Sequence, residues 1–256
     1  MAGRTDTQAS ALPMFYRAPE AITPERHGGK ALALSGDLSF AAKAHVIPLM
    51  AAEMPAAMRS YPIVFSGPDF MPMVVTGIRK DENLFVDGEG RWAEPHYVPA
   101  YVRRYPFILA GGDTDERLAL CIENDPARLV DAGSNGEAKP LFVRQSDGAL
   151  GKGEVIDSAL SFCEQYQGMF VKTRQIMKVI TDSGLLAERT SKISLNDGES
   201  FNITGFHLVD EAKLNAMSDE AYLKLRKADA LATIYCHLAS MNSWTSILHQ
   251  ASLRRA

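Results

Sequence analysis

The sequence predicts an α+β fold, with a mainly β N-terminal half followed by a C-terminal half built around helices. Three patterns support this prediction: a repeated peptide followed by apolar runs, one long stretch of helical periodicity, and a tight-turn signal between apolar residues. The 256 residues suffice for one domain or two closely packed subdomains. We expect a duplicated β subdomain over residues 14–125, a linker over 126–152 and a mainly helical subdomain with a hairpin over 153–256, packed as one unit.

The N-terminal half contains an internal duplication. PAAMRSYP at residues 55–62 returns 44 residues later as PAYVRRYP at 99–106, with five of the eight positions identical. Large apolar residues follow each copy, and turn-forming residues then precede a second apolar run. Each copy is predicted to form a short helix or turn, a Tyr-Pro corner and a strand–loop–strand pair. The tyrosine at the corner is expected to be extended, because proline disfavours the helical conformation of the residue before it. We expect the two pairs to share one sheet.

The same duplication supplies the candidate partner-binding residues, which are Arg59, Tyr61, Arg103, Arg104 and Tyr105. In a structural interpretation, each repeated arginine stacks on the tyrosine two residues later or bonds backbone carbonyls at the corner. In a functional interpretation, the three arginines line a groove for an anionic or carboxylate-bearing partner, because a planar guanidinium binds such groups bidentately. The sequence leaves both interpretations open.

Turn and helix signals define the remaining elements. Asp87-Gly88 predicts a hairpin over residues 82–92, and residues 125–152 are predicted to carry one short strand at 141–143. Apolar residues at helical spacing over 154–181 predict one long helix, with Gly184 as its cap.

The C-terminal part continues with a second hairpin and shorter helices. Asn196-Asp197-Gly198 predicts the hairpin turn, and the second strand extends to Val209. Asp210 and Ser218 are predicted helix N-caps. An apolar helix over 228–240 and a last helix, capped by Asn242, complete the chain.

Composition excludes some classes of function. The net charge is −4 and no basic stripe is present, which argues against a nucleic-acid partner. No apolar segment approaches the roughly 18 residues that a membrane helix needs, so we expect no membrane insertion. Because the N-terminus is polar and lacks the apolar core of a signal peptide, we expect a cytoplasmic protein.

Catalytic and cofactor motifs are absent from the sequence. It contains no nucleophile elbow, phosphate-binding loop or dinucleotide fingerprint, and its six histidines form no metal-binding pair. We therefore expect no catalytic residue and no cofactor. His45 and His96, which precede the two copies, are the candidates for a metal or acid–base site.

Several segments together resemble the SapC family of bacterial proteins. They are FYRAPE at 15–20, FAAKAHVIPL at 40–49, the first Tyr-Pro unit, ENLFVD at 82–87, YVPAYVRRYPF at 97–107, GFHLVDEAKL at 205–214 and IYCHLASM at 234–241. The family name comes from surface-layer systems, and some members carry a peptide-transporter label. The resemblance implies a nutrient-uptake or peptide-modification pathway beside outer-membrane receptors, and it supplies no catalytic residue to transfer.

Three functions remain open at this point. The leading hypothesis is a non-enzymatic binding or adaptor protein for a protein or peptide in a surface-receptor, surface-layer or peptide-uptake pathway, with a homodimer as a further possibility. One alternative is a metal-dependent peptide-modifying enzyme or oxygenase that uses His45 or His96. The other is a structural surface-layer component.

Overall fold

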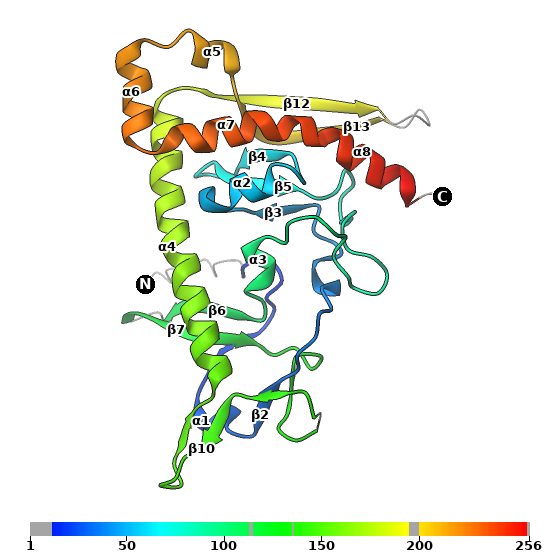
Figure 1. Cartoon of the computed structure of the whole chain (residues 1–256), viewed down its shortest axis with the longest axis vertical. Helices are drawn as coiled ribbons and strands as arrows, with labels where there is room; N and C mark the ends of the chain where they lie inside the picture. Colours follow the sequence, from blue (N-terminus) through cyan, green and yellow to red (C-terminus); the bar gives the residue numbers. More distant parts are fainter. Residues whose placement is uncertain (1–11, 113–114, 135, 195–199, 255–256) are drawn as a thin grey trace, which may run out of the picture. The chain divides into compact units, whose positions relative to one another are not determined.

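The computed structural model describes residues 12–112, 115–134, 136–194 and 200–254. These residues form an α+β fold of antiparallel sheets and separate helices, as the sequence predicts (Figure 1). Contacts group the chain into two compact units, unit 1 with Met1–Ser35 and Tyr105–Leu160, and unit 2 with Gly36–Arg104 and Ser161–Ala256. The units are therefore interleaved along the chain, whereas the sequence suggested three consecutive segments.

Unit 1 is built from short strands. A three-stranded sheet has the order β1-β7-β6, a second has the order β8-β2-β9, and β10 pairs with β11. The segment 126–152, expected to be a linker with one strand, contains four strands in its described residues, because β8 and β9 pair with the distant β2 and β10 pairs with β11. The elements are β1 (Pro19–Ala21), α1 (Pro24–His27), β2 (Lys30–Leu32), β6 (Phe107–Gly112), β7 (Asp115–Glu123), β8 (Leu129–Asp131), β9 (Lys139–Pro140), β10 (Phe142–Arg144) and β11 (Leu150–Lys152).

The N-terminal segment is attached to the β6–β7 pair by buried polar groups. The hydroxyl of Tyr16 donates to the carbonyl of Phe107 at 2.6 Å. The buried carboxylate of Glu123 accepts hydrogen bonds from the backbone N–H groups of Arg17 and Ala18 at 3.0 and 3.1 Å. A buried carboxylate without donors would be costly, so these bonds fix where β1 joins β7.

Unit 2 contains a five-stranded antiparallel sheet with the order β12-β13-β4-β5-β3. The β4–β5 pair places Ile63 opposite Val74, and β13 joins β4 where His207 faces Phe65. Its strands are β3 (Val46–Pro48), β4 (Ile63–Ser66), β5 (Met71–Val75), β12 (Leu186–Ser194) and β13 (Ser200–Val209). The predicted hairpin is thus confirmed over its strands, while its turn at residues 196–198 lies outside the described residues.

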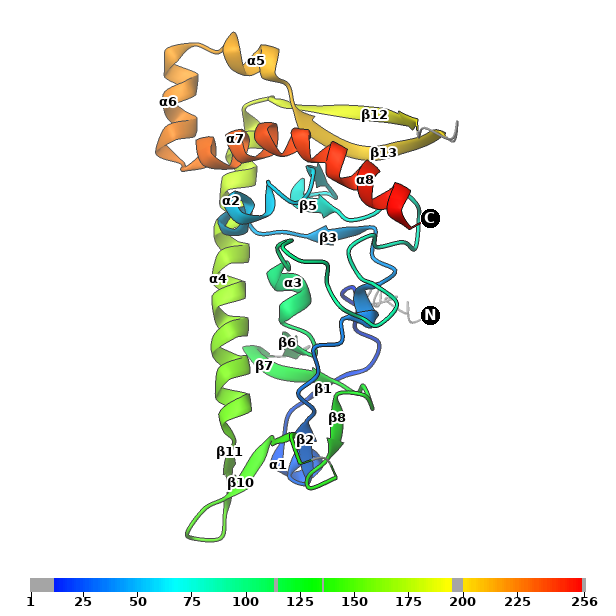
Figure 2. The same cartoon turned by 45° about the vertical axis from the view of Figure 1, so that its right-hand side comes forward.

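Helices cover this sheet. The long helix α4 spans Glu154–Asp182, and Gly184 follows it with φ +70°, the left-handed conformation expected of the cap. Helix α7 contacts β4 and β13, and Figures 1 and 2 show it lying along the sheet. The other helical elements are η1 (Ser39–Ala41), η2 (Ala51–Glu53), α2 (Met54–Ala57), α3 (Ala100–Arg103), α5 (Glu211–Asn215), α6 (Asp219–Lys227), α7 (Ala230–Ser240), η3 (Met241–Ser243) and α8 (Trp244–Leu253).

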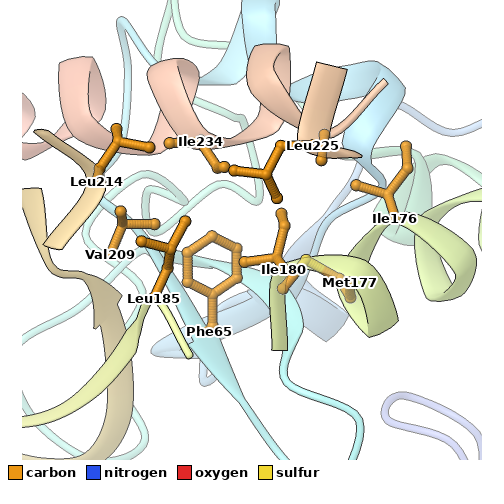
Figure 3. Close-up of a cluster of buried hydrophobic side chains, with 10 residues drawn as sticks. Phe65, Ile176, Met177, Ile180, Leu185, Val209, Leu214, Leu225 and Ile234 are labelled. Atoms are coloured by element: carbon orange, nitrogen blue, oxygen red, sulfur yellow. The ribbon is translucent and has the colours of Figure 1, made fainter. Parts of the chain in front are cut away.

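The main core of unit 2 lies between α4, α7 and the sheet. Figure 3 shows the Phe65 ring of β4 between Leu185 and Ile180, with Ile234 of α7 above it. Phe65 and Ile180 are completely buried. Removing a side chain such as Phe65 from a packed core costs about 3–5 kcal/mol, so this cluster contributes strongly to holding α4 and α7 on the sheet.

The duplication folds as predicted within each copy but not between copies. Each copy forms a short helix, a Tyr-Pro corner and an antiparallel pair, which is β4–β5 in the first copy and β6–β7 in the second. The two pairs belong to different sheets, so the expectation of one shared sheet is wrong. Each pair is extended by a different strand: β13 pairs with β4 of the first copy, and β1 pairs with β7 of the second.

Capping predictions have mixed outcomes. Asp210 and Ser218 accept hydrogen bonds from Lys213 N–H and Ala221 N–H, which confirms both as N-caps. Asn242 is not a cap: it lies within η3, which continues from α7 into α8. The predicted hairpin over 82–92 forms a turn with one described bridge, between Val86 and Trp92. The Asp87 carboxylate accepts hydrogen bonds from the backbone of this turn.

Candidate functional site

Arg103, at the end of α3, is held by neighbours within unit 2. Its Nε donates to the carbonyl of Val98 at 3.1 Å, and a terminal nitrogen donates to the hydroxyl of Tyr97 at 3.0 Å. The guanidinium carbon also lies 5.6 Å from the Tyr97 ring centre and 5.5 Å from that of Phe162. The carbonyl bond agrees with the structural interpretation of the repeat, whereas the aromatic partners are not the tyrosine two residues later.

Tyr97 connects this arginine to a buried carboxylate. Its hydroxyl donates to Glu53 Oε1 at 2.9 Å, and Glu53 also accepts from Ala100 N–H at 2.6 Å and Met50 N–H at 2.9 Å. Burial and the negative charge of Glu53 raise the pKa of Tyr97 to about 12, so it stays a hydrogen-bond donor. Glu53 and Arg103 are therefore both engaged in hydrogen bonds within the fold, and these bonds connect η2 to α3.

The half-buried Arg104 lies against two aromatic rings. Its guanidinium carbon lies 4.1 Å from the Tyr101 ring centre and 4.6 Å from the Tyr166 ring centre. These distances fit cation–π contacts, which are stronger when partly buried. Burial raises the pKa of the Tyr166 phenol, so the ring stays neutral beside the cation. Arg104 thus helps to pack α3 against α4.

The two repeated tyrosines are anchored inside their units. Tyr61 is fully buried; its hydroxyl donates to the carbonyl of Tyr97 at 2.6 Å and accepts from the Trp92 indole at 2.9 Å. Tyr105, in unit 1, donates to an Asp125 carboxylate oxygen at 2.8 Å. Burial raises the pKa of both phenols. These contacts support a structural role for both tyrosines.

Arg59 has different surroundings. It is exposed, and within the described part of the chain it makes no hydrogen bond or ion pair. It borders a hollow of about 340 Å³, which we call the Arg59 hollow. The lining residues are Met58, Arg59, Ala239, Asn242, Ser243, Thr245 and Ser246. Neither Arg103 nor Arg104 is among them, so the structure does not bring the three arginines together in this hollow.

The two histidine candidates lie among apolar and backbone groups. The rings of His96 and Phe85 pack in a T-shaped arrangement with 4.8 Å between their centres, and burial lowers the pKa of His96. His45 is half-buried, and its carbonyl accepts from Thr76 N–H at 2.9 Å. In the described ranges, no group of three or more histidine, cysteine, aspartate or glutamate side chains is arranged to hold a metal ion.

A larger hollow, which we call the α4 groove, lies between one face of α4 and the turn joining β4 to β5. Its volume is about 490 Å³, within the size range of small-ligand and side-chain sites. Its apolar part comes from Phe70 and from Val171, which is 46% exposed. The lining residues are Pro68, Asp69, Phe70, Val171, Arg174, Gln175, Lys178, Thr181 and Asp182.

Charged pairs border the α4 groove. Arg174 lies 3.1 Å from Asp69 across it, and Lys178 lies 2.8 Å from Asp182 along α4. All four side chains are more than half exposed, so each pair contributes at most about 1 kcal/mol and is readily exchanged for a partner's charge.

Phe70 occupies the groove in a strained conformation. Its φ is +49°, which is unusual for a bulky residue, and its ring packs edge-on against His207 at 4.7 Å. Such strain is concentrated at functional sites. The sequence prediction missed this groove. The available signal was Val171, an apolar residue placed outside the apolar face of the helix.

Comparisons with known proteins identify a family. The SapC family model matches residues 22–247, which is most of the chain. Comparison with curated proteins and with solved structures gave no match. No helix in the described ranges combines the length and the apolar character needed to cross a membrane.

Proposed function

The chain belongs to the SapC family, and we propose that it is a non-enzymatic binding or adaptor protein that engages a peptide segment of its partner in the α4 groove. As the resemblance implies, the partner belongs to a surface-receptor, surface-layer or peptide-uptake pathway, and binding takes place in the cytoplasm. The observation that supports this proposal is an apolar surface formed by the exposed Val171 and the half-buried Phe70, bordered by charged side chains of both signs.

The groove has the features of a peptide site. An apolar side chain of the partner gains free energy by covering Val171 and Phe70, at about 25 cal/mol for each Å² of apolar surface removed from water. The flanking Arg174 and Asp69 then offer a cation and an anion to the peptide on either side of that anchor. Buried apolar anchors with a polar rim are typical of such interfaces.

The test compares two substitutions of equally exposed apolar residues. Val171→Asp places a charge in the α4 groove, whereas Leu223→Asp places one on α6, where Leu223 is 43% exposed and outside the groove. Tagged variants are cross-linked in the native bacterium, and the captured proteins are identified. We expect a stoichiometric partner with the unchanged protein and with Leu223→Asp, and its loss with Val171→Asp.

Two results would contradict the proposal. If Val171→Asp retains the partner, or if both variants lose it equally, the groove is not the contact. Metal analysis of the same purified protein addresses the enzymatic alternative: stoichiometric iron or zinc without a protein partner favours a metal-dependent enzyme, and His45 and His96 are then the first residues to replace.

A further inference from the structure

The Arg59 hollow is separate from the α4 groove, and the proposed function does not use it. It lies in unit 2, where the chain leaving α2 meets the continuous run of α7, η3 and α8. No residue borders both hollows. An inference about the Arg59 hollow is therefore independent of the peptide site.

The walls of the Arg59 hollow are fixed to each other. The buried hydroxyl of Ser243 donates to the carbonyl of Met58 at 2.8 Å, which joins the helical run to the residue next to Arg59. Just beyond, Ser240 accepts from Ile63 N–H at 3.0 Å. These bonds hold the hollow in shape before any ligand arrives, which lowers the ordering cost of binding.

Several hydrogen-bond donors in the hollow have no acceptor among the residues that the structure describes. Asn242 uses one amide hydrogen on the carbonyl of Ala239 at 3.3 Å, which leaves a second. The Ser246 hydroxyl and the Arg59 guanidinium make no hydrogen bond or ion pair with the residues that the structure describes. The lining contains no aspartate or glutamate, so nothing on the wall neutralises the guanidinium.

We propose that the Arg59 hollow binds a carboxylate, carried by a small acid or by the C-terminus of a peptide. The Arg59 fork pairs with both carboxylate oxygens, and Ser246 and Asn242 supply further donors. Among the described residues, Arg59 is the one cationic residue that lines the hollow. Its single positive charge matches the single negative charge of a carboxylate better than the nearly double charge of phosphate. Met58 and Ala239 offer apolar contact for the carbon next to the carboxylate.

The experiment uses NMR on the full chain labelled with nitrogen-15. The probe is N-acetyl-alanyl-alanine, whose only charge is its carboxylate, and binding is followed on the Arg59 Nε–H and Ser246 backbone N–H signals. We expect saturable shifts of both signals. We expect Arg59→Gln to weaken binding by about 10- to 100-fold on the Ser246 signal, the usual effect of losing a charge-assisted pair.

Three comparisons make the result decisive. Arg226→Gln removes another exposed arginine, on α6, that makes no hydrogen bond or ion pair with the described residues, and it should leave the affinity unchanged. The amide of the same dipeptide and inorganic phosphate should each bind at least about tenfold more weakly. The proposal is overturned if the acid gives no saturable shift, if the amide or phosphate binds as tightly, or if Arg226→Gln has the same effect as Arg59→Gln.

A comparison with acetate distinguishes the two sources of the carboxylate. If the physiological ligand is a free small acid, acetate should bind as tightly as the dipeptide. If it is the C-terminus of a peptide, the dipeptide should bind more tightly than acetate.

Discussion

His237 on α7 donates its Nδ1–H to the carbonyl of Ile63 on β4, with 2.7 Å between the two atoms. Its other ring nitrogen accepts from Val209 N–H of β13 at 3.1 Å, which fixes the neutral tautomer. The imidazole is fully buried, and the Phe65 ring lies 4.8 Å away. His237 thus connects β4 and β13 through α7, beside the point where these strands pair directly.

This connection predicts a pH-dependent stability. Burial lowers the pKa of His237 to about 4, below the value near 6.5 of an unfolded histidine. Between these values the unfolded chain binds the extra proton, so the contribution of His237 is complete above about pH 6.5 and is lost as the pH falls toward 4. Its full size is about 3 kcal/mol. Urea unfolding measured from pH 4 to pH 7 should show this slope.

Two histidine variants separate this effect from the titration of carboxylates. His237→Gln should be less stable at pH 7 and should show a shallower dependence between pH 4 and pH 6.5. His249→Gln, which changes an exposed histidine of α8, should keep the original dependence. Equal slopes in the two variants would show that His237 does not titrate on unfolding.

The two repeated arginines are predicted to differ in their effect on stability. Arg103→Ala removes two hydrogen bonds and two aromatic contacts and should cost about 1–2 kcal/mol, reduced from the sum of its contacts because the side chain is exposed. Arg59→Ala removes no described contact and should change stability by less than about 0.5 kcal/mol. Urea unfolding of both variants at one pH tests this. An equal loss in both would mean that Arg59 also holds the fold.

Glu53 is predicted to be the costliest single carboxylate to alter in unit 2. Glu53→Gln turns one acceptor oxygen into an NH₂ group that faces a donor, either Met50 N–H or the pair formed by Ala100 N–H and the Tyr97 hydroxyl. Leaving buried donors unpaired costs about 1–3 kcal/mol each. Thermal and urea unfolding measure the loss. Glu220→Gln, on an exposed side chain paired with Lys224, is the matched control, and a similar loss there would contradict this role for Glu53.

Local patterns in the sequence predicted the elements that depend on near neighbours. The 29 residues of α4, the caps Asp210 and Ser218, and the helix–corner–hairpin form of each repeat follow from periodicity, hydroxyl or carboxyl caps and proline. Each of these involves interactions within a few residues, so the residue types alone specify them.

Only the tertiary structure decided which distant segments meet. The sequence offered Arg59, Arg103 and Arg104 as equivalents, but Arg103 meets Phe162 of α4 whereas Arg59 borders Ser246 of α8. Identical residues in duplicated peptides acquire different partners because strand pairing and helix packing are set by long-range burial, which places the two copies in different sheets. The sequence by itself therefore determined local elements such as α4 and the family resemblance. The packing of segments far apart in the chain determined that Arg103 is held within the fold, whereas Arg59 borders an open hollow.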